Sequence, residues 1–324
     1  MIKRRLLLTA AATSLGTASL TTRGHAEPEW PNKPLRFVVG FSAGSTPDLI
    51  ARTIGDPLSQ LLGQPVVVEN KPGASGNIAA DIVAKARDDH TVGVMINLNL
   101  TIARILNPTV AYDPRTDLAP ICLVGTTPFL LAISAKWMGQ KAGIDQLRTA
   151  GSKLNYGSVG IGSMAHLGME LLCAKLGIKP THIPYPGNPQ VLQALAANEI
   201  DVAFVPAGIA MQQVNGGKIG ALAVASAKPS DLAPGVPTLS ALGVKDVEIE
   251  GWVAVAVAAT MAEPHRKKLE TQVLKVLSSP EVRKQLTQQG WDVAALPSDA
   301  LARRLEAETE MLSQIITAQN IHVN

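Results

Sequence analysis

The sequence contains few cysteines and few histidines, and their spacing matches no metal site. Only two of its 324 residues are cysteines, Cys122 in a β-like run and Cys173 on the apolar face of a predicted helix. The six histidines are scattered along the chain, so we expect no metal ion and no cofactor. The two cysteines are either buried small hydrophobic residues or, in an oxidising compartment, partners in a disulfide whose geometry the sequence cannot fix.

Long apolar runs are also missing after the first 26 residues. The longest later run, near Trp252 to Ala262, is too short to cross a bilayer. The formal net charge of the chain is +3, but four of its 29 basic side chains and none of its 26 acidic ones lie in residues 1–26. The remaining chain has a net charge of about −1, which gives no reason to expect nucleic acid or an anionic membrane surface as a partner.

Residues 1–26 have the pattern of a secretory signal peptide. A cationic start, Lys3-Arg4-Arg5, precedes an uncharged apolar run from Leu6 to Leu20, and Gly24-His25-Ala26 supplies a small-x-small cleavage pattern. The paired arginines also satisfy a loose twin-arginine pattern, so the general and the twin-arginine export routes both stay open. We expect a periplasmic protein whose mature chain begins at Glu27.

Two loops rich in glycine and serine each follow a predicted strand and precede a predicted helix. Their candidate ligand residues are Phe41, Ser42, Ala43, Gly44, Ser45 and Asp48 in the first loop, and Ser158, Gly160, Gly162, Ser163 and His166 in the second. Helix N-terminal N–H groups have no intrahelical partner, glycine lets the backbone approach closely and serine adds donors. Facing each other across a cleft, the loops would hold a small carboxylate. The alternative is that Asp48 and Ser163 serve only as helix caps.

Short β-branched runs alternate with helical stretches, which is typical of parallel βα units. Strands are predicted at residues 35–39, 66–69, 92–96, 130–133, 155–157, 182–184, 202–205, 219–225 and 252–258. Helices are predicted at residues 49–62, 76–86, 165–176, 189–198, 263–278, 279–289 and 298–319. This order predicts two α/β lobes, with residues 27–130 and 227–324 in a discontinuous lobe 1 and residues 131–226 in lobe 2. The C-terminal helices should pack back onto lobe 1. Ligands of open α/β sheets bind at the carboxyl ends of strands, where both loops fall.

Eight segments together resemble one protein family. They are Trp30–Pro34, Phe41–Asp48, Leu62–Asn70, Lys71–Asn77, Tyr112–Pro120, Gly157–Leu167, His182–Tyr185 and Gly251–Trp252. In this order they are similar to the substrate-binding proteins of tripartite tricarboxylate transporters, the Bug group of bacterial periplasmic receptors. The resemblance implies a two-lobed periplasmic binding protein fold, each lobe a mixed sheet flanked by helices, with the cleft between the lobes. It also implies closure on a small organic anion, usually a carboxylate, delivery to an inner-membrane permease, and no enzymatic activity.

The resemblance further implies that the residues of the two loops contact the ligand, and three departures bear on its chemistry. The chain has Ser42-Ala43-Gly44-Ser45 where the family typically has Pro-Pro-Gly-Gly, and Tyr185-Pro186-Gly187 where it often has Tyr-Lys-Gly. It has Val205-Pro206 where an Asp-Asn pair often stands. Because this chain lacks the lysine and the Asp-Asn pair found there in the family, we expect a ligand with one carboxylate and an apolar or aromatic remainder. If the ligand is an amino acid, Asp48 gains a direct role.

Two other functions compete with transport. In a secreted hydrolase Ser163 and His166 would share a helix face near Ser158, but neither serine stands in a Gly-x-Ser-x-Gly elbow and no carboxylate to orient the histidine is evident. A receptor that reports its ligand to a sensor protein would have the same sequence features as a transport receptor. We expect a monomeric transport receptor that closes about a hinge near residues 127–133, 223–226 and 250–252.

Overall fold

The computed structural model describes residues 29–139 and 143–318. The predicted signal peptide, residues 1–26, lies outside the described residues. Contacts between residues group the described chain from Pro31 onwards into one compact unit. Within the described part of the chain, no helix is both long enough and apolar enough to cross a membrane.

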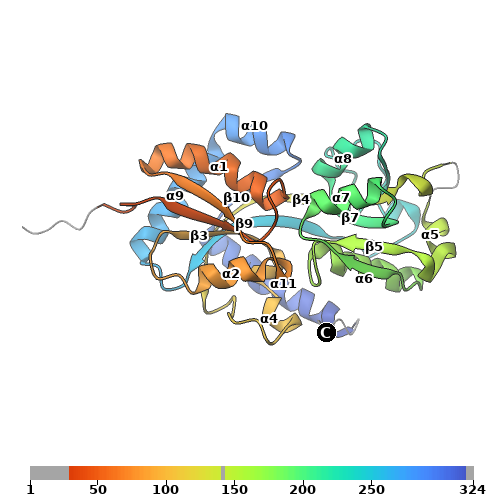
Figure 1. Cartoon of the computed structure of the whole chain (residues 1–324), viewed down its shortest axis with the longest axis horizontal. Helices are drawn as coiled ribbons and strands as arrows, with labels where there is room; N and C mark the ends of the chain where they lie inside the picture. Colours follow the sequence, from red (N-terminus) through yellow and green to blue (C-terminus); the bar gives the residue numbers. More distant parts are fainter. Residues whose placement is uncertain (1–28, 140–142, 319–324) are drawn as a thin grey trace, which may run out of the picture. The chain divides into compact units, whose positions relative to one another are not determined.

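Three parallel strands and two connecting helices form the first part of this unit. β1 (Leu35–Val39) pairs with β2 (Val66–Asn70) on one side and with β3 (Thr91–Ile96) on the other. α1 (Thr46–Leu62) and α2 (Asn77–Ala84) connect the strands in turn (Figure 1). The predicted strands and helices of this region are confirmed. Both β1 and β3 are apolar along most of their length because they are covered on two faces.

One long strand, β4 (Leu118–Ser134), takes part in two groups of strands. Its first part pairs antiparallel with β9 (Glu250–Ala258) and with β10 (Asp292–Pro297). Its last part pairs antiparallel with β7 (Val202–Pro206) and with β8 (Ile219–Val224). Two more strands, β5 (Asn155–Ser158) and β6 (Thr181–Pro184), complete the second group. β4 therefore joins the two halves of a sheet whose order along its main path is β2-β1-β3-β9-β4-β7-β5-β6.

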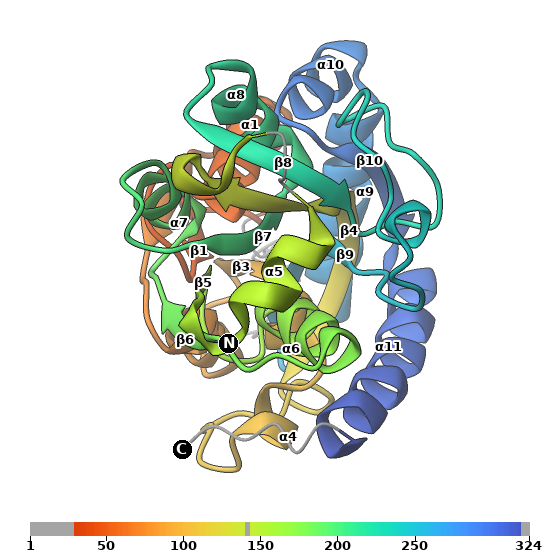
Figure 2. The ribbon, with the colours of Figure 1, turned by 90° about the vertical axis from the view of Figure 1, so that its right-hand side faces the viewer.

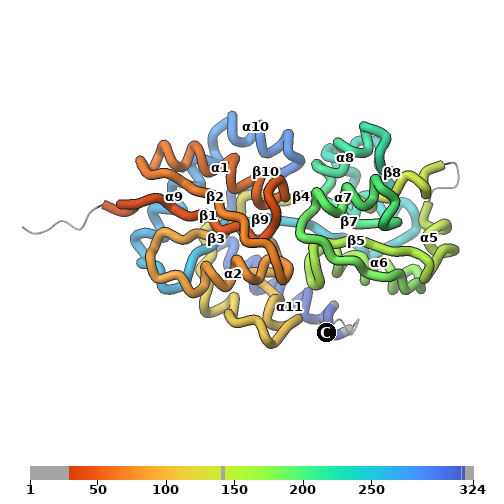
Figure 3. The backbone as a smooth tube through the Cα atoms, viewed as in Figure 1, coloured from red at the N-terminus to blue at the C-terminus, as the bar shows by residue number. Residues whose placement is uncertain are grey.

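The change of partner in β4 falls at one peptide bond. Pro128 pairs with Glu250 of β9, whereas the next residue, Phe129, pairs with β7. A returning segment lies beside this point, since the N–H of Ala225 donates to the carbonyl of Phe129 over 2.8 Å and the N–H of Ile249 donates to the carbonyl of Ala225 over 2.9 Å. Figure 3 shows the chain crossing here between the two groups of strands. The crossings coincide with the predicted hinge segments, while the hinge motion stays a prediction.

The second group of strands is again parallel. β5 (Asn155–Ser158) pairs with β6 (Thr181–Pro184) on one side and with β7 on the other. α6 (Met164–Leu176) and α7 (Asn188–Ala196) connect these strands in turn. Two helices of this half, α5 (Ile144–Ala150) and α8 (Ala207–Asn215), were not predicted from the sequence.

Three C-terminal helices pack against the first half, as the sequence predicts. α9 (Glu263–Ser278) and α10 (Pro280–Gln288) contact α1. α11 (Ser298–Ala318) contacts β4 and β10, and Figure 2 shows it as a long helix at the edge of the view. Two short helices of the first half were not predicted, α3 (Asn97–Leu100) and α4 (Ala103–Leu106).

Both cysteines are buried and free. Cys122 lies in β4 and Cys173 in α6. Burial raises the pKa of both thiols, that of Cys173 to about 12, so neither is a thiolate near neutral pH. Of the two alternatives, the structure favours small buried apolar side chains over a disulfide.

Candidate functional site

The first predicted loop leads into the N-terminus of α1. Ser45 occupies the N-cap position, and the first helical bond runs from the N–H of Leu49 to the carbonyl of Ser45 over 2.9 Å. The N–H groups of Thr46 and Asp48 precede that bond and have no acceptor within the helix. Pro47, between them, has no N–H and is suited to a first turn. The helix therefore presents two backbone donors beside the hydroxyl of Ser45.

Asp48 shapes this loop, but it is not the helix cap. The prediction that Asp48 caps α1 is wrong, because Ser45 takes that position. The Asp48 carboxylate accepts the N–H of Gly44 over 2.8 Å and the amide of Asn70 over 2.9 Å, and it pairs with Arg52 over 3.0 Å. Burial alone would raise its pKa, but hydrogen bonds from Arg52, Gly44 and Asn70 outweigh that effect and hold the pKa below its ordinary value. The negative charge is thus compensated inside the loop.

The second predicted loop leads into the N-terminus of α6. Ser163 is the N-cap, as predicted: its hydroxyl accepts the N–H of His166 over 3.3 Å and donates to the carbonyl of Gly160 over 2.7 Å. The first bond of the helix runs from the N–H of Leu167 to the carbonyl of Ser163 over 2.9 Å. The N–H groups of the two residues after Ser163 therefore have no acceptor within the helix.

Two glycines allow this loop to lie close to the first half of the molecule. Gly160 and Gly162 have φ values of 121° and 80°, which L side chains rarely adopt. A Cβ atom at Gly160 would lie 2.0 Å from the hydroxyl of Ser75, and one at Gly162 would lie 2.1 Å from a methyl group of Leu106. A larger residue at either position would displace the loop.

A cluster of three aromatic rings, Tyr156, His166 and His182, packs beside the second loop. Tyr156 stacks on His182 with 4.8 Å between the ring centroids, and the ring of His166 lies tilted against His182 with 4.5 Å between the two imidazole centroids. The N–H of Gly162 donates to Nδ1 of His166 over 3.2 Å, and Ser158 Oγ lies 2.7 Å from Nε2 of His182. Burial lowers the pKa of His166 to about 4, and burial together with the nearby His166 lowers that of His182 to about 4. Both imidazoles are therefore neutral near pH 7 and position the loop.

These contacts do not assemble the hydrolase arrangement. His166 uses Nδ1 to accept a backbone N–H, and the hydroxyl of Ser163 donates to a carbonyl, so the histidine is not a base for this serine. Ser158 and His182 do form a close pair, but Ser158 is only 1% exposed. Among the described residues, no cluster of three or more His, Cys, Asp or Glu side chains is placed to hold a metal ion.

The N-termini of α1 and α6 border one cavity of about 40 Å³. Of the predicted ligand residues, Phe41, Ser45 and Ser163 line this cavity, and Gly160 lines a neighbouring one. The others lie in the two loops around the cavities without lining either: Ser42, Ala43, Gly44, Asp48, Ser158, Gly162 and His166.

The hydroxyl of Ser45 is the least satisfied polar group of this cavity. Ser45 is 1% exposed, and its Oγ has no hydrogen-bond partner among the described residues. Burying a hydroxyl without a partner costs about 1–3 kcal/mol. An unpaired hydroxyl beside free helix N–H groups is therefore suited to an acceptor atom of a bound ligand.

Several cavity residues were not identified from the sequence. Asn188, the first residue of α7, donates through its amide to the hydroxyl of Thr46 over 3.1 Å, which joins the two halves. Both residues precede a proline at a helix start, a signal that marks first turns and could have identified them. Thr127 also lines the cavity, but it lies fully buried in a strand, where nothing in the sequence distinguishes it.

Two further hydrogen bonds donated by side chains connect the halves beside the cavity. The hydroxyl of Ser42 donates to the side-chain oxygen of Gln190 over 3.1 Å. The hydroxyl of Ser75 donates to the carbonyl of Ile161 over 3.1 Å. The hydroxyl of Ser42, predicted to contact the ligand, thus contacts the opposite half of the protein.

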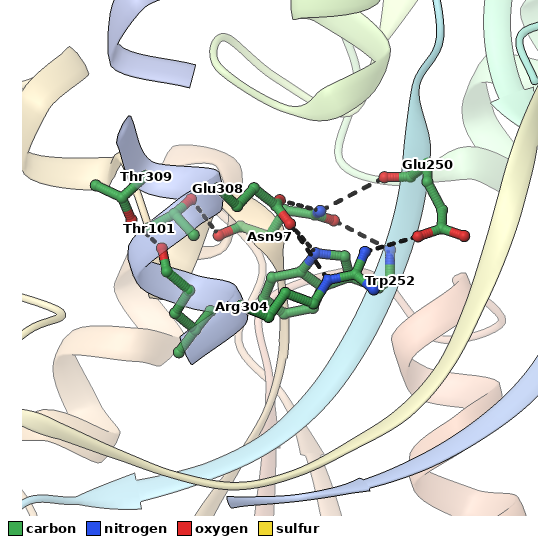
Figure 4. A network of polar contacts seen from close by, with 8 residues as sticks. Asn97, Thr101, Glu250, Trp252, Arg304, Glu308 and Thr309 are labelled. Atoms are coloured by element: carbon green, nitrogen blue, oxygen red, sulfur yellow. Dashed lines mark hydrogen bonds and ion pairs between the residues drawn. The ribbon is translucent and has the colours of Figure 1, made fainter. Parts of the chain in front are cut away.

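A buried polar network holds one wall of the cavity (Figure 4). Asn97 and Trp252 line the cavity, and both donate to the carboxylate of Glu308 on α11, over 2.6 Å and 2.8 Å respectively. The backbone N–H of Trp252 also donates to the side-chain oxygen of Asn97 over 3.1 Å. Arg304, one helical turn before Glu308, pairs with Glu250 at the start of β9 over 2.6 Å. The C-terminal helix therefore fixes two residues of the cavity wall.

A mixed α/β fold in two halves, with helix N-termini converging on a cavity between them, defines a periplasmic binding protein. In agreement, the structure is similar to that of the periplasmic binding protein BugD, with a TM-score of 0.86, 26% identity and coverage of 90% of this chain and 99% of that one. The chain belongs to the tripartite tricarboxylate transporter family of receptors, whose family model matches residues 50–321.

Relatives by sequence and by structure agree with this family. A UPF0065 protein from the tcbD-tcbE intergenic region of Pseudomonas sp. (strain P51) is 30% identical, with 100% of this chain and 96% of that protein covered. Rpa4515 of R. palustris, solved with adipate, has a TM-score of 0.86 and 29% identity over 91% of this chain and 99% of its own. MatC from Rhodopseudomonas palustris, with bound malate, has a TM-score of 0.83 and 28% identity over 89% of this chain and 100% of its own.

Proposed function

We propose that this protein is a periplasmic receptor that binds a small organic carboxylate and delivers it to a tripartite tricarboxylate-type permease. The observation that carries the proposal is the unpaired, buried hydroxyl of Ser45 in a cavity bordered by the N-termini of α1 and α6. The carboxylates bound by MatC and Rpa4515 support the same ligand class.

In the proposed complex, the carboxylate accepts hydrogen bonds from both sides of the cavity. The N–H group of Thr46 and the hydroxyl of Ser45 act from α1, and the two N–H groups after Ser163 act from α6. Helix N-termini also attract negative charge through their aligned peptide dipoles. The Asp48 carboxylate does not oppose this, because its charge is paired with Arg52.

We place the cavity between two lobes, with residues 27–130 and 227–324 in lobe 1 and residues 131–226 in lobe 2. The change of strand partners between Pro128 and Phe129 supports the first of these boundaries, near residue 130. Residues 1–26 are proposed to direct export and to be removed, in keeping with the periplasmic location of this class of protein. Mass spectrometry of fractionated cells should find a periplasmic chain that starts at Glu27, and a cytoplasmic form that retains Met1 would contradict this.

A thermal-shift screen of organic acids, followed by calorimetry, tests the binding function. A true ligand should raise the melting temperature by an amount that grows with the logarithm of its concentration relative to its Kd. The variant Ser45→Ala should then bind the identified acid roughly ten- to a hundredfold more weakly, because a hydrogen bond to a charged oxygen contributes about 1.5–3 kcal/mol. If no organic acid shifts the melting temperature, or if Ser45→Ala binds as the wild type does, the proposed site is wrong.

A further inference from the structure

We propose that the ligand is a monocarboxylate with an uncharged, largely apolar remainder, and that this remainder lies in a second cavity beside the first. This inference rests on the proposed function and narrows its ligand. It comes from the sizes of the two cavities and from the side chains that line the second one.

The first cavity is small. Its volume is about 40 Å³, and it is the smaller of two adjoining cavities. A ligand whose carboxylate lies in the first cavity therefore finds most of its space in the second.

The second cavity adjoins the first and is much larger. It has a volume of about 370 Å³ and shares two lining residues, Phe41 and Val159, with the first cavity. These two side chains come from the two predicted loops, one from each half of the molecule. A ligand held by its carboxylate in the first cavity would leave it between Phe41 and Val159.

The lining of the second cavity is neutral and mostly apolar. Among the described residues, no Asp, Glu, Lys, Arg or His side chain lines either cavity. Apolar side chains come from the first half, such as Leu98, Leu106 and Val110, and from the second half, such as Ile161 and Tyr185. Such a surface stabilises an aliphatic chain or an aromatic ring by burying its apolar area.

One polar group of this surface is already paired. The side-chain oxygen of Asn77, at the first position of α2, accepts hydrogen bonds from Asn99 over 2.9 Å and from Tyr112 over 2.9 Å. A second carboxylate in this cavity would lose water without gaining a cationic side chain, and an unpaired buried charge is strongly unfavourable. The N-terminus of α2 and the amide of Asn107 would attract an anion, so dicarboxylates are the necessary comparison.

Calorimetry with matched pairs of acids tests the inference on the wild-type protein. The pairs are hexanoate with adipate and 4-methylbenzoate with terephthalate, which differ in whether the far end carries a second carboxylate. We expect the monocarboxylate of a pair to bind at least tenfold more tightly. Equal or tighter binding of the dicarboxylates, or binding of other organic anions with no member of these pairs, would overturn the inference and leave the proposed function intact. If no organic acid of any kind binds, the proposed function itself fails.

A charge-introducing variant tests where the remainder lies. Pro186 is exposed and lines the second cavity. Its contact with the other half is a hydrogen bond that its backbone carbonyl accepts from the N–H of Ser42 over 3.4 Å, so the side chain can be replaced without removing that bond. Pro186→Lys should improve dicarboxylate binding about tenfold relative to the paired monocarboxylate. Pro234→Lys, at an exposed proline outside both cavities, is the matched control and should leave the ratio unchanged. An unchanged ratio in Pro186→Lys, or the same change in both variants, would show that the remainder lies elsewhere.

Discussion

Individual hydroxyl groups in the two loops have different tasks. Ser45 has an unpaired Oγ in the cavity, whereas Ser158 Oγ contacts Nε2 of His182 over 2.7 Å and the N–H of Gly160 over 3.1 Å. We therefore predict opposite outcomes for two alanine variants. Ser158→Ala should lower the free energy of unfolding by about 1–3 kcal/mol, because buried partners lose their bonds. The affinity of the folded protein for its ligand should change little.

Chemical denaturation and calorimetry on both variants check this contrast. Ser45→Ala should be at least as stable as the wild type and lose affinity. A large loss of affinity in Ser158→Ala at wild-type stability would instead place its hydroxyl on the ligand, as the sequence suggests.

The two neutral histidines make stability depend on pH. The pKa of His166 falls from its ordinary value to about 4 through burial, and that of His182 falls to about 4 through burial and the nearness of His166. Because the unfolded chain binds these protons more readily, stability is fully present above about pH 6.5 and declines as the pH falls towards 4. At full protonation the loss is about 3 kcal/mol for His166.

Denaturant unfolding between pH 4.5 and 7.5 measures this loss. The variant His182→Gln removes one titrating group, so its stability should fall less steeply with acidification than that of the wild type. Identical slopes for the two proteins would mean that His182 does not titrate in this range.

The sequence alone identified only some of the residues of the candidate site. The sequence identified both loops because glycine, serine and a following helix stand together in each. It did not identify Thr127 or Asn188, which reach the cavity from separate strands and helices. It also assigned a helix cap to Asp48, since the sequence does not show that Asn70 and Gly44 bond its carboxylate.

At the scale of elements, α11 acts on the cavity through one carboxylate. Glu308 accepts hydrogen bonds from Asn97 and Trp252, and it is only 9% exposed. Glu308→Gln keeps the shape but replaces one acceptor oxygen by a donor, which then faces an N–H group. We predict a loss of about 1–3 kcal/mol in the free energy of unfolding and weaker ligand binding, because Asn97 and Trp252 line the cavity.

Glu306→Gln on the exposed face of the same helix is the control. It makes the same chemical change away from the network and should leave both stability and affinity close to wild type. If the two variants behave alike, the network does not support the cavity.

The sequence predicted regular elements better than irregular ones. β1 and β3 were found because each is a short apolar run between polar segments. β4 was predicted only for residues 130–133, because Pro120 and Pro128 interrupt its pattern and register shifts bend its first half. β10 was missed because its residues are only partly buried and show no clear alternation. Pairing with β4 determines this strand, and a local pattern cannot show that pairing.

For the whole molecule, we predict that ligand binding brings the two halves together. The bonds of Ser42 to Gln190 and of Ser75 to Ile161 join them beside the cavity. A bound anion should add to these few contacts and shift the population towards the closed form. Small-angle scattering should show a smaller radius of gyration with saturating ligand than without it, at a mass that fits the predicted monomer. An unchanged radius would contradict the hinge.

The cavity wall also gives the protein an optical signal of its own. Two of the four tryptophans in the chain, Trp252 and Trp291, line the cavity, and both are at most 3% exposed. A ligand that enters there changes the dielectric surroundings of both indole rings and displaces any water beside them. The emission of the unlabelled protein should therefore change in wavelength or intensity as the receptor fills. Receptor occupancy could then be followed in real time without attaching a dye.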